Sequence, residues 1–572
     1  MTTELATKIW ASKYRQSGES NIEDTWVRVA NAIAAAEHDS ESHTGGFRSI
    51  LSSNRFLPGG RVIAGAGTGK QVTLFNCFVS GPLLDSVERI FESLKETAVT
   101  MQQGGGIGLD FSALRPAGTA AVRTGSMASG PVSFMHIWDL LCQTLLATST
   151  RRGAMMGTLS CDHPDIEKFV DAKRIAGELA NFNLSVLITD AFMRAIDNGA
   201  DWPLVYPPGT DQVYSRIPAR DLWQRIVCSA HETAEPGLLF IDTINRENNL
   251  HYCERIAATN PCGEVPLPPY GACNLGSLNL TAFVANPFTA QCALDEGRLL
   301  DTVRVAVRFM DDVIDVSRFP LDQQAEQARA TRRIGLGITG LADALVMLGL
   351  HYDSDEARES AAGTMKMIRD AAYSASIELA KEKAAFPRFR KDDFLQSPFV
   401  RRLPGRLRDG IADNGIRNSH LLAIAPAGTI SLLAHNVSSG AEPIYALRAE
   451  RAVRASEADV ERLDVWDYAY GLWRESRGST EQLPGVFVTA NELPARAHLE
   501  MQACLQPFVD GAISKTINLP PDATAADVEK AFRYAWRSGI KGCTVYRRGA
   551  RSGQVLRALA DAHCCDADRE AD

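Results

Sequence analysis

The sequence lacks both an excess of positive charge and a long apolar run. Among its 572 residues, 60 Lys and Arg are balanced by 69 Asp and Glu, which gives a net charge of −9. Proteins that coat nucleic acid or anionic lipid need clustered positive charge, so this balance argues against both kinds of partner. The most apolar segment, residues 421–434, contains Pro426 and Gly428 and is shorter than the roughly 20 apolar residues of a membrane helix. We therefore expect no nucleic-acid partner and no membrane span.

A secretory signal and low-complexity segments are also missing. Glu4 and Lys8 lie where a signal peptide needs an unbroken apolar core. The 44 Gly and 26 Pro are too few for a disordered, low-complexity chain. We expect a cytoplasmic location, and in that reducing compartment the 12 cysteines do not form a structural disulfide framework. Most of them should be buried, and a few are candidates for catalysis or redox chemistry.

Helical and strand-like patterns alternate along most of the chain. Residues 8–60 have a helical pattern. Further on, short β-rich runs such as 183–188 and 421–425 alternate with helical segments such as 87–102 and 356–383. Strand–helix alternation of this length predicts α/β architecture around one large sheet or barrel.

The most informative segment is Asn260-Pro-Cys-Gly-Glu264. In an extended chain, Asn260, Cys262 and Glu264 would lie on one face, because successive side chains alternate. Pro261 fixes its own φ and removes a donor, and Gly263 would let another group approach the backbone closely. The segment thus presents an amide, a thiol and a carboxylate. By itself, such a short motif is more typical of an ordinary loop that holds an incidental buried cysteine.

Two further cysteines and several longer motifs change that interpretation. Cys273 follows in Gly-Ala-Cys-Asn-Leu, and Cys77 lies far upstream in Leu-Phe-Asn-Cys-Phe. Together with Cys262 they resemble the catalytic subunit of ribonucleotide reductase, and the resemblance spans nearly the whole chain. The other motifs that carry it are Gly104-Gly-Gly-Ile-Gly-Leu-Asp-Phe-Ser-Ala-Leu-Arg115, Arg151-Arg-Gly-Ala-Met-Met156, Asn181-Phe-Asn-Leu-Ser185, Arg333-Ile-Gly-Leu-Gly337, Ala425-Pro-Ala-Gly-Thr-Ile-Ser431 and Ser514-Lys-Thr-Ile-Asn-Leu-Pro520.

The resemblance implies a fold and a radical mechanism. The fold would be a ten-stranded α/β barrel with a central finger loop that carries Cys262, preceded by a small helical region. The activity would be reduction of ribonucleotides to 2′-deoxyribonucleotides for DNA synthesis and repair. Cys262 would be the transient thiyl radical, Glu264 the general base for the 3′-hydroxyl and Asn260 a hydrogen-bond partner of the hydroxyls. Cys77 and Cys273 would supply a proton and two electrons and end as a disulfide.

The resemblance also implies where nucleotides bind. The expected substrate contacts are Asn76, Gly106, Pro426, Ala427, Gly428, Thr429 and Ile430. A turn rich in Pro, Gly and hydroxyl groups exposes backbone N–H groups that bind phosphate, and a helix that starts after Thr429 would add its dipole. Arg115 would belong to an allosteric site for deoxynucleotide effectors, and the loop 173–181 resembles the specificity loop of the family. In that loop, Arg174 and Glu178 are candidate effector contacts or, equally, solvated surface charges.

The glycine run at 104–108 has a second interpretation, as the phosphate loop of a dinucleotide-binding fold. That match is weak, because the run follows a helix-like segment rather than a strand.

The source of the radical is predicted from what the matching motifs lack. In Lys541-Gly-Cys-Thr-Val-Tyr546, Val545 stands where oxygen-dependent members have the first tyrosine of a pair that relays the radical from a partner subunit. The residues from Arg551 onward lack the glycyl-radical motif of anaerobic members. The remaining class uses adenosylcobalamin. No Asp-x-His-x-x-Gly cobalamin motif is present, but this class keeps the cofactor's own base attached, so no cobalamin or metal ligand is predicted. The alternatives are a catalytic subunit that depends on a radical-generating partner, and a catalytically silent nucleotide-binding regulator.

The end of the chain departs from the family pattern. A mobile cysteine pair normally re-reduces the active-site disulfide, and here the candidates Cys564 and Cys565 are adjacent. A disulfide between neighbours closes a strained ring that is easily reduced, so one of the pair could carry electrons from thioredoxin or a similar dithiol. The alternative is an exposed pair without a function.

We expect three regions, a helical region at 1–70, the barrel at 71–550 and a tail at 551–572. We also expect a homodimer if the effector site lies at a subunit contact.

Overall fold

The computed structural model describes residues 3–120, 127–146, 154–175, 177–454, 460–478, 481–550 and 557–558. The two adjacent cysteines of the tail, Cys564 and Cys565, lie outside these residues, as do Arg151 and Arg152 of one motif. The boundaries expected at residues 70 and 550 stay predictions.

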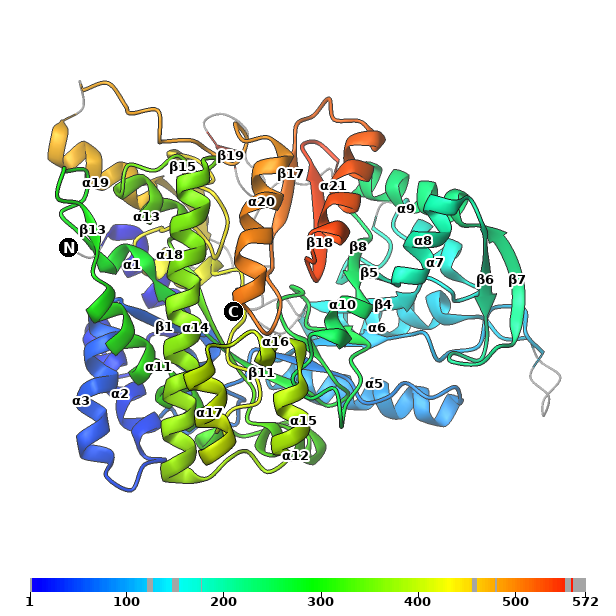
Figure 1. Ribbon diagram of the computed structural model, residues 1–572, viewed down its shortest axis with the longest axis horizontal. Coiled ribbons are helices and arrows are strands. Elements are labelled where there is room, and N and C mark those ends of the chain that lie inside the picture. The colour runs from blue at the N-terminus through cyan, green and yellow to red at the C-terminus, as the bar shows by residue number, and fades with distance from the viewer. Residues whose placement is uncertain are drawn as a thin grey trace.

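The chain begins with helices that pack on one side of the molecule. These are α1 (Glu4–Ile9), η1 (Trp10–Tyr14), α2 (Ile22–Ala34), α3 (Ser40–Ser52) and α4 (Gly60–Gly65). A capping box of Asn21 and Asp24 starts α2, which satisfies the first unpaired amides of that helix. Helices α2 and α3 pack against each other and against α11 (Glu296–Val316), and Figure 1 shows them beside α11 at one end of the molecule.

One large sheet forms the centre of the fold. Its ten strands are β1 (Phe56–Pro58), β2 (Cys77–Val79), β3 (Gly106–Asp110), β4 (Met155–Ser160), β5 (Phe182–Ile188), β8 (Gly237–Phe240), β11 (Ala272–Asn279), β14 (Ile334–Thr339), β17 (Thr516–Leu519) and β18 (Gly542–Arg547). Strands β2 to β5 and β8 run parallel, as do the pairs β11–β14 and β17–β18. The five-stranded parallel set pairs antiparallel with β11 at one edge, through β2, and with β18 at the other edge, through β8.

Residues 421–425 join the two ends of this sheet. On one side, the amide of Ala423 donates to the carbonyl of Leu336 in β14 (3.2 Å). On the other side, the amide of Ile424 donates to the carbonyl of Ala512 (3.1 Å), just before β17. Residues 421–425 therefore close the barrel. The sequence predicts a strand here, and the structure shows isolated bridges instead. The expected α/β barrel is confirmed.

Helices cover the outside of the barrel. The larger ones are α5 (Val87–Gln102), α6 (Pro131–Leu146), α8 (Asp190–Asn198), α9 (Ala219–Thr233), α11, α12 (Asp322–Thr331), α14 (Asp355–Lys383), α17 (Gly405–Asn414), α19 (Tyr468–Arg477), α20 (Ala495–Leu505) and α21 (Ala525–Arg537). Shorter helices are α7 (Ile166–Asp171), α10 (Ile241–Arg246), α13 (Leu341–Met347), α15 (Lys391–Gln396), α16 (Pro398–Arg401) and α18 (Gly428–Leu433). None of the helices in the described ranges combines the length and the apolar character needed to cross a membrane.

Small hairpins complete the architecture. The hairpin of β6 (Asp201–Val205) and β7 (Val213–Pro218) projects at the end of the molecule opposite the N-terminal helices (Figure 1). A second pairs β15 (Arg448–Arg454) with β16 (Val460–Trp466), and β19 (Arg557–Ala558) adds to its edge. The remaining pairs are β9 (Ala258–Thr259) with β10 (Pro266–Leu267) and β12 (Val284–Ala285) with β13 (Ala293–Leu294).

Candidate active site

The hairpin of β9 and β10 holds the predicted Asn260–Glu264 segment inside the barrel. Strand β9 packs against β3 and β4. A Cβ on Gly108 of β3 would lie 1.9 Å from the carbonyl oxygen of Thr259, so only glycine allows the hairpin to approach this closely. Asn183 Nδ2 of β5 donates to the carbonyl of Pro261 (2.9 Å), and the amide of Ala512 donates to the carbonyl of Glu264 (2.8 Å). Two separate parts of the barrel wall therefore fix the hairpin.

The tip of the hairpin is a turn, so the expectation of an extended chain is wrong. The amide of Gly263 donates to the carbonyl of Asn260 (3.1 Å), which bends the backbone between the two residues. Gly263 has φ +84°, and no atom lies within 4 Å of a Cβ built on it. Glycine is therefore required here by the left-handed backbone, not by the close approach that the sequence suggested.

The two expected redox cysteines face each other across neighbouring strands. Cys77 of β2 and Cys273 of β11 are direct partners in the antiparallel register. Direct partners have Cα atoms about 4.5–5.5 Å apart, within the roughly 4.4–6.8 Å that a disulfide needs. Both residues are buried and neither is in a disulfide. Asn260 connects the hairpin to this pair, since its Nδ2 donates to Sγ of Cys77 (3.4 Å) while its Oδ1 accepts from the amide of Val265 (2.9 Å).

Glu264 is a buried carboxylate with an unsatisfied oxygen. The residue is 1% exposed, and its Oε2 has no hydrogen-bond partner among the residues the structure describes. Burial raises the pKa of Glu264 to about 7, against the lowering effect of Asn260. A carboxyl group with this pKa exchanges a proton near neutral pH, as a general base must. Burial, and after it the carboxylate of Glu264, raises the pKa of the Cys77 thiol. Burial and Cys77 do the same for Cys273, so both cysteines keep their protons.

The expected substrate contacts fall into two groups. Asn76 and Gly106 lie beside Cys77, because the amide of Gly106 donates to the carbonyl of Asn76 (2.9 Å) and Gly106 pairs with Cys77 in the β2–β3 register. Asn76 is buried, and its Oδ1 has no hydrogen-bond partner in the described part of the chain. The second group, residues 426–430, directly follows the segment that closes the barrel. Helix α18 starts there at Gly428, earlier than the sequence suggested, with Ala427 as its N-cap.

The three expected effector residues lie beside three different sets of polar partners. Arg115 Nε lies 2.7 Å from Asp85 Oδ2, Arg174 Nε lies 3.1 Å from Glu232 Oε2, and Glu178 Oε2 lies 3.3 Å from His136 Nδ1. Tyr206 also donates to Asp85 (2.9 Å). Sequence reasoning missed Asp85 and Tyr206, because only the fold brings these distant residues to Arg115.

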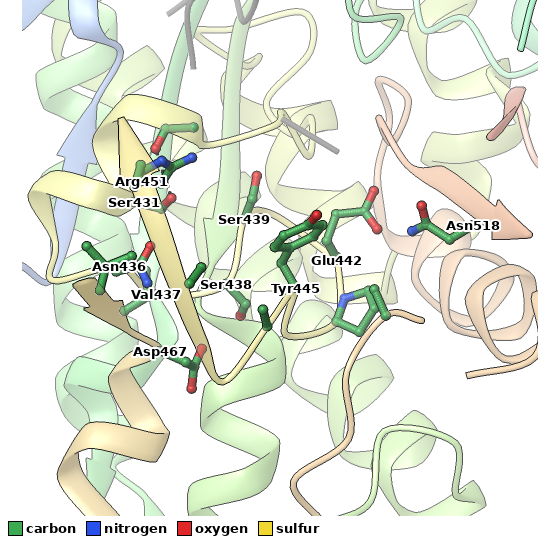
Figure 2. A pocket seen from close by; sticks show the side chains of 16 residues that line it. Ser431, Asn436, Val437, Ser438, Ser439, Glu442, Tyr445, Arg451, Asp467 and Asn518 are labelled. Atoms are coloured by element: carbon green, nitrogen blue, oxygen red, sulfur yellow. Dashed lines mark hydrogen bonds between the residues drawn. The ribbon is translucent and has the colours of Figure 1, made fainter. Parts of the chain in front are cut away.

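A pocket opens next to α18 and was not predicted from the sequence. It is lined by residues of α18, residues 436–446, the β15–β16 hairpin and β17, together with Asp467 and Ala490. Figure 2 shows Ser439, Tyr445 and Glu442 along it, with Asn518 reaching it from β17. Amide, hydroxyl and carboxylate groups therefore alternate with apolar side chains in its wall.

The fold and the site together define a class, an α/β barrel that carries a cross-strand pair of buried cysteines beside a buried carboxylate. Residues 75–546 match the family model described as "Ribonucleotide reductase, barrel domain", and residues 1–71 match "Ribonucleotide reductase, all-alpha domain". The chain belongs to the ribonucleotide reductase family.

Similar proteins carry more specific names. The chain is 42% identical over 556 residues to a vitamin B12-dependent ribonucleoside-diphosphate reductase of Mycobacterium tuberculosis, covering 93% of this chain and 77% of the relative. It is 39% identical over 554 residues to a protein of the same name from Thermoplasma acidophilum, covering 94% and 69%. A ribonucleoside-diphosphate reductase subunit alpha of Chlamydia muridarum is 26% identical over 610 residues, covering 94% of this chain and 57% of that subunit.

Proposed function

We propose that this chain is an adenosylcobalamin-dependent reductase that converts ribonucleotides, as diphosphates, to 2′-deoxyribonucleotides. The observation that carries the proposal is the placement of the half-buried Cys262 on a turn between the buried Asn260 and Glu264, with Asn260 bonded to Cys77 of the cross-strand cysteine pair. The names of the relatives support the cofactor and the diphosphate. A catalytically silent nucleotide-binding regulator would have no need for the amide, thiol and carboxylate of the turn to lie beside a cysteine pair.

The residues of the site account for each atom of the reaction. The Cys262 thiyl radical takes the 3′-hydrogen of the ribose, and Glu264 accepts the proton of the 3′-hydroxyl. The 2′-oxygen then leaves as water, with a proton from the cysteine pair. Cys77 and Cys273 are oxidised to a disulfide as they supply two electrons in all, and Cys262 returns its hydrogen to the 3′-carbon. The balance is ribonucleotide plus dithiol giving deoxyribonucleotide, disulfide and water.

The pocket beside α18 offers a donor set that fits the cofactor. Cobalamin presents apolar ring faces and a rim of amides, and the pocket combines Tyr445 with the polar side chains of Asn436, Ser439 and Asn518. We assign these four residues to hold it. Bound adenosylcobalamin supplies the initiating radical. Binding is measured from the visible spectrum of hydroxocobalamin added to the chain, and a double variant, N436A with N518A, should weaken it.

The test of the function needs only the single chain. Purified protein with adenosylcobalamin, a small dithiol and a ribonucleoside diphosphate should form deoxynucleotide without any metal-bearing subunit. The first alternative, a partner-dependent subunit, would be inactive in this assay. Val545, which is buried on β18 where that subunit has a tyrosine, argues against it.

The regulation and oligomeric state are part of the same proposal. Deoxynucleotide effectors would bind near Arg115 and Asp85. Exposed apolar side chains lie on and next to α5 and α6, at Val87 (66% exposed), Phe91 (50%) and Leu140 (63%), and such a patch is typical of a protein contact. A homodimer through these helices would cover it, and sedimentation of the F91E variant against the parent tests this.

In this proposal, the cysteines of the C-terminal tail supply the electrons for repeated turnover. Cys564 or Cys565 would reduce the Cys77–Cys273 disulfide and be reduced in turn by thioredoxin or a similar dithiol. Deleting residues 560–572 should leave the yield of a single turnover intact, because a reduced site already holds two electrons. Turnover driven by thioredoxin should collapse. Normal turnover of the truncated chain with thioredoxin would contradict the shuttle.

A further inference from the structure

A buried lysine and a buried aspartate lie behind the active-site hairpin, and the reaction steps above do not use them. Lys541 precedes β18, and its Nζ donates to the carbonyls of Asp510 (2.7 Å) and Gly511 (2.8 Å). Both charged residues are buried, at 4% and 2% exposure. They line a small cavity together with Val265 and Pro266 of the hairpin.

The carboxylate of Asp510 holds the segment that closes the barrel. It accepts from the amide of Leu421 (2.9 Å) and from the amide of Leu422 (2.8 Å), using one oxygen for each. Tyr373 donates to the same carboxylate (2.7 Å). The chain then runs directly from residue 422 into the predicted phosphate-binding residues 426–430. The position of that turn therefore depends on Asp510.

The backbone that Lys541 holds also holds Glu264. The amide of Ala512, directly after the two carbonyls bound by Lys541, donates to the carbonyl of Glu264 (2.8 Å). The fit around this backbone is tight. A Cβ on Gly511 would lie 2.7 Å from the carbonyl oxygen of Leu422 and 3.3 Å from that of Glu264. A shift of residues 510–512 would therefore be transmitted to Glu264.

We propose that Lys541 and Asp510 are positioning residues with separate targets, Lys541 acting on Glu264 and Asp510 on the phosphate-binding turn. The proposal rests on the proposed function for its kinetic consequences. Burial lowers the pKa of Lys541 to about 8, so the protein keeps this ammonium inside at a cost that its two carbonyl partners offset. A role in setting the site explains why an apolar side chain does not occupy this position.

The test separates the two residues by their kinetic effects. In K541M the backbone at 510–512 loses its two hydrogen bonds to the lysine. We expect kcat to fall about 100-fold, because misplacing a reacting group by about 1 Å has an effect of that size. KM should stay nearly unchanged. In D510N the amide of Leu421 or of Leu422 loses its acceptor. We expect KM for the ribonucleotide to rise about 10-fold, which corresponds to the loss of one buried hydrogen bond. The change in kcat should be smaller. K541R keeps a cation with several donors and should recover most of kcat.

The matched control is Lys383, a partly buried lysine whose side chain binds no residue of the proposed site. Lys383 binds Glu37 (2.9 Å) and Asp312 (2.7 Å), and K383M should lower the melting temperature without changing kcat or KM of the folded enzyme. If K541M does not fold, G511A tests the same geometry by pressing on Leu422 and Glu264, and its kcat should fall.

Two results would overturn the proposal. One is a K541M or G511A enzyme that is folded and has the kcat of the parent. The other is a D510N enzyme with unchanged ribonucleotide affinity in equilibrium dialysis. The binding measurement needs no turnover, so an inactive parent would reject the proposed function while the role of Asp510 could still be judged.

Discussion

Two buried polar regions of this molecule are built in opposite ways. On helix α11, Asp311 is fully buried, and both its oxygens are engaged, by Arg332 Nε at 2.8 Å and by Arg417 Nε at 3.1 Å. Burial alone would raise the pKa of Asp311, but the two guanidinium groups hold it below the usual value. In the active-site turn, Glu264 is buried to the same degree, one of its oxygens has no hydrogen-bond partner within the described part of the chain, and its pKa rises to about 7.

The difference shows what each region is for. A buried charge that is fully paired keeps its charge and stabilises the fold only while its partners remain. A buried carboxylate without full pairing costs stability in its charged form, and in return can accept a proton near neutral pH. Removing the charge should therefore destabilise the protein at Asp311 and stabilise it at Glu264, which the following variants test.

The largest effect is expected at the thiol of the turn. C262S should abolish deoxynucleotide formation, because a hydroxyl O–H bond is too strong to give the needed radical, while its size and polarity preserve the site. Nucleotide binding, measured by equilibrium dialysis, should survive. Deoxynucleotide formed above background by this variant would show that Cys262 is not the radical residue.

Glu264 comes second. E264Q should lose about 10²- to 10⁴-fold in kcat, since an amide cannot take the 3′-hydroxyl proton. In the parent, kcat should rise with pH through about 7, where Glu264 ionises. The pKa of Glu264 in the folded protein lies above the ordinary value of 4.5, so Glu264 weakens the fold as the pH rises from 4.5 to 7. E264Q should therefore be more stable than the parent at pH 8 and equal to it at pH 4. If E264Q were less stable than the parent at pH 8, the proposed difference between Glu264 and Asp311 would be wrong.

Asp311 should respond with the opposite sign. D311N removes the negative charge that Arg332 and Arg417 share, and both then keep only Asp315 as an acidic partner among the residues the structure describes, which should cost about 1–3 kcal/mol of unfolding free energy. The pKa of Asp311 is lowered in the folded state, so its contribution in the parent is present above the unfolded value and lost as the pH falls. Urea unfolding at pH 7 measures the loss, and kcat of the folded fraction should not change.

The smallest effect is expected for an exposed pair on the same helix. Arg304 Nη1 lies 2.7 Å from Asp301 Oδ1, and the two side chains are 64% and 72% exposed. R304A should change the unfolding free energy by less than about 1 kcal/mol, because water screens such pairs. A loss as large as that of D311N would show that burial is not what separates the two pairs.

Local patterns were readable where neighbours in the sequence decide the structure. The helix at 87–102 was predicted with the bounds that the structure gives it, because its start and its apolar spacing are local. The three cysteines, Asn260 and Glu264 were predicted as one site through their motifs. The shape of the turn was not, since the left-handed backbone of Gly263 is one of several conformations that glycine allows.

The sequence by itself determined the alternation of strands and helices and the chemical groups of the site, because residue type and spacing carry both. Only the tertiary structure decided that Cys77 and Cys273 lie opposite each other in the β2–β11 register, that Asp85 meets Arg115 and that Lys541 holds the backbone behind Glu264. Each of these contacts joins residues far apart in the chain, and closure of the barrel by residues 421–425 brings the two halves together. The raised pKa of Glu264 has the same origin, since burial is a property of the folded barrel and not of the five-residue motif.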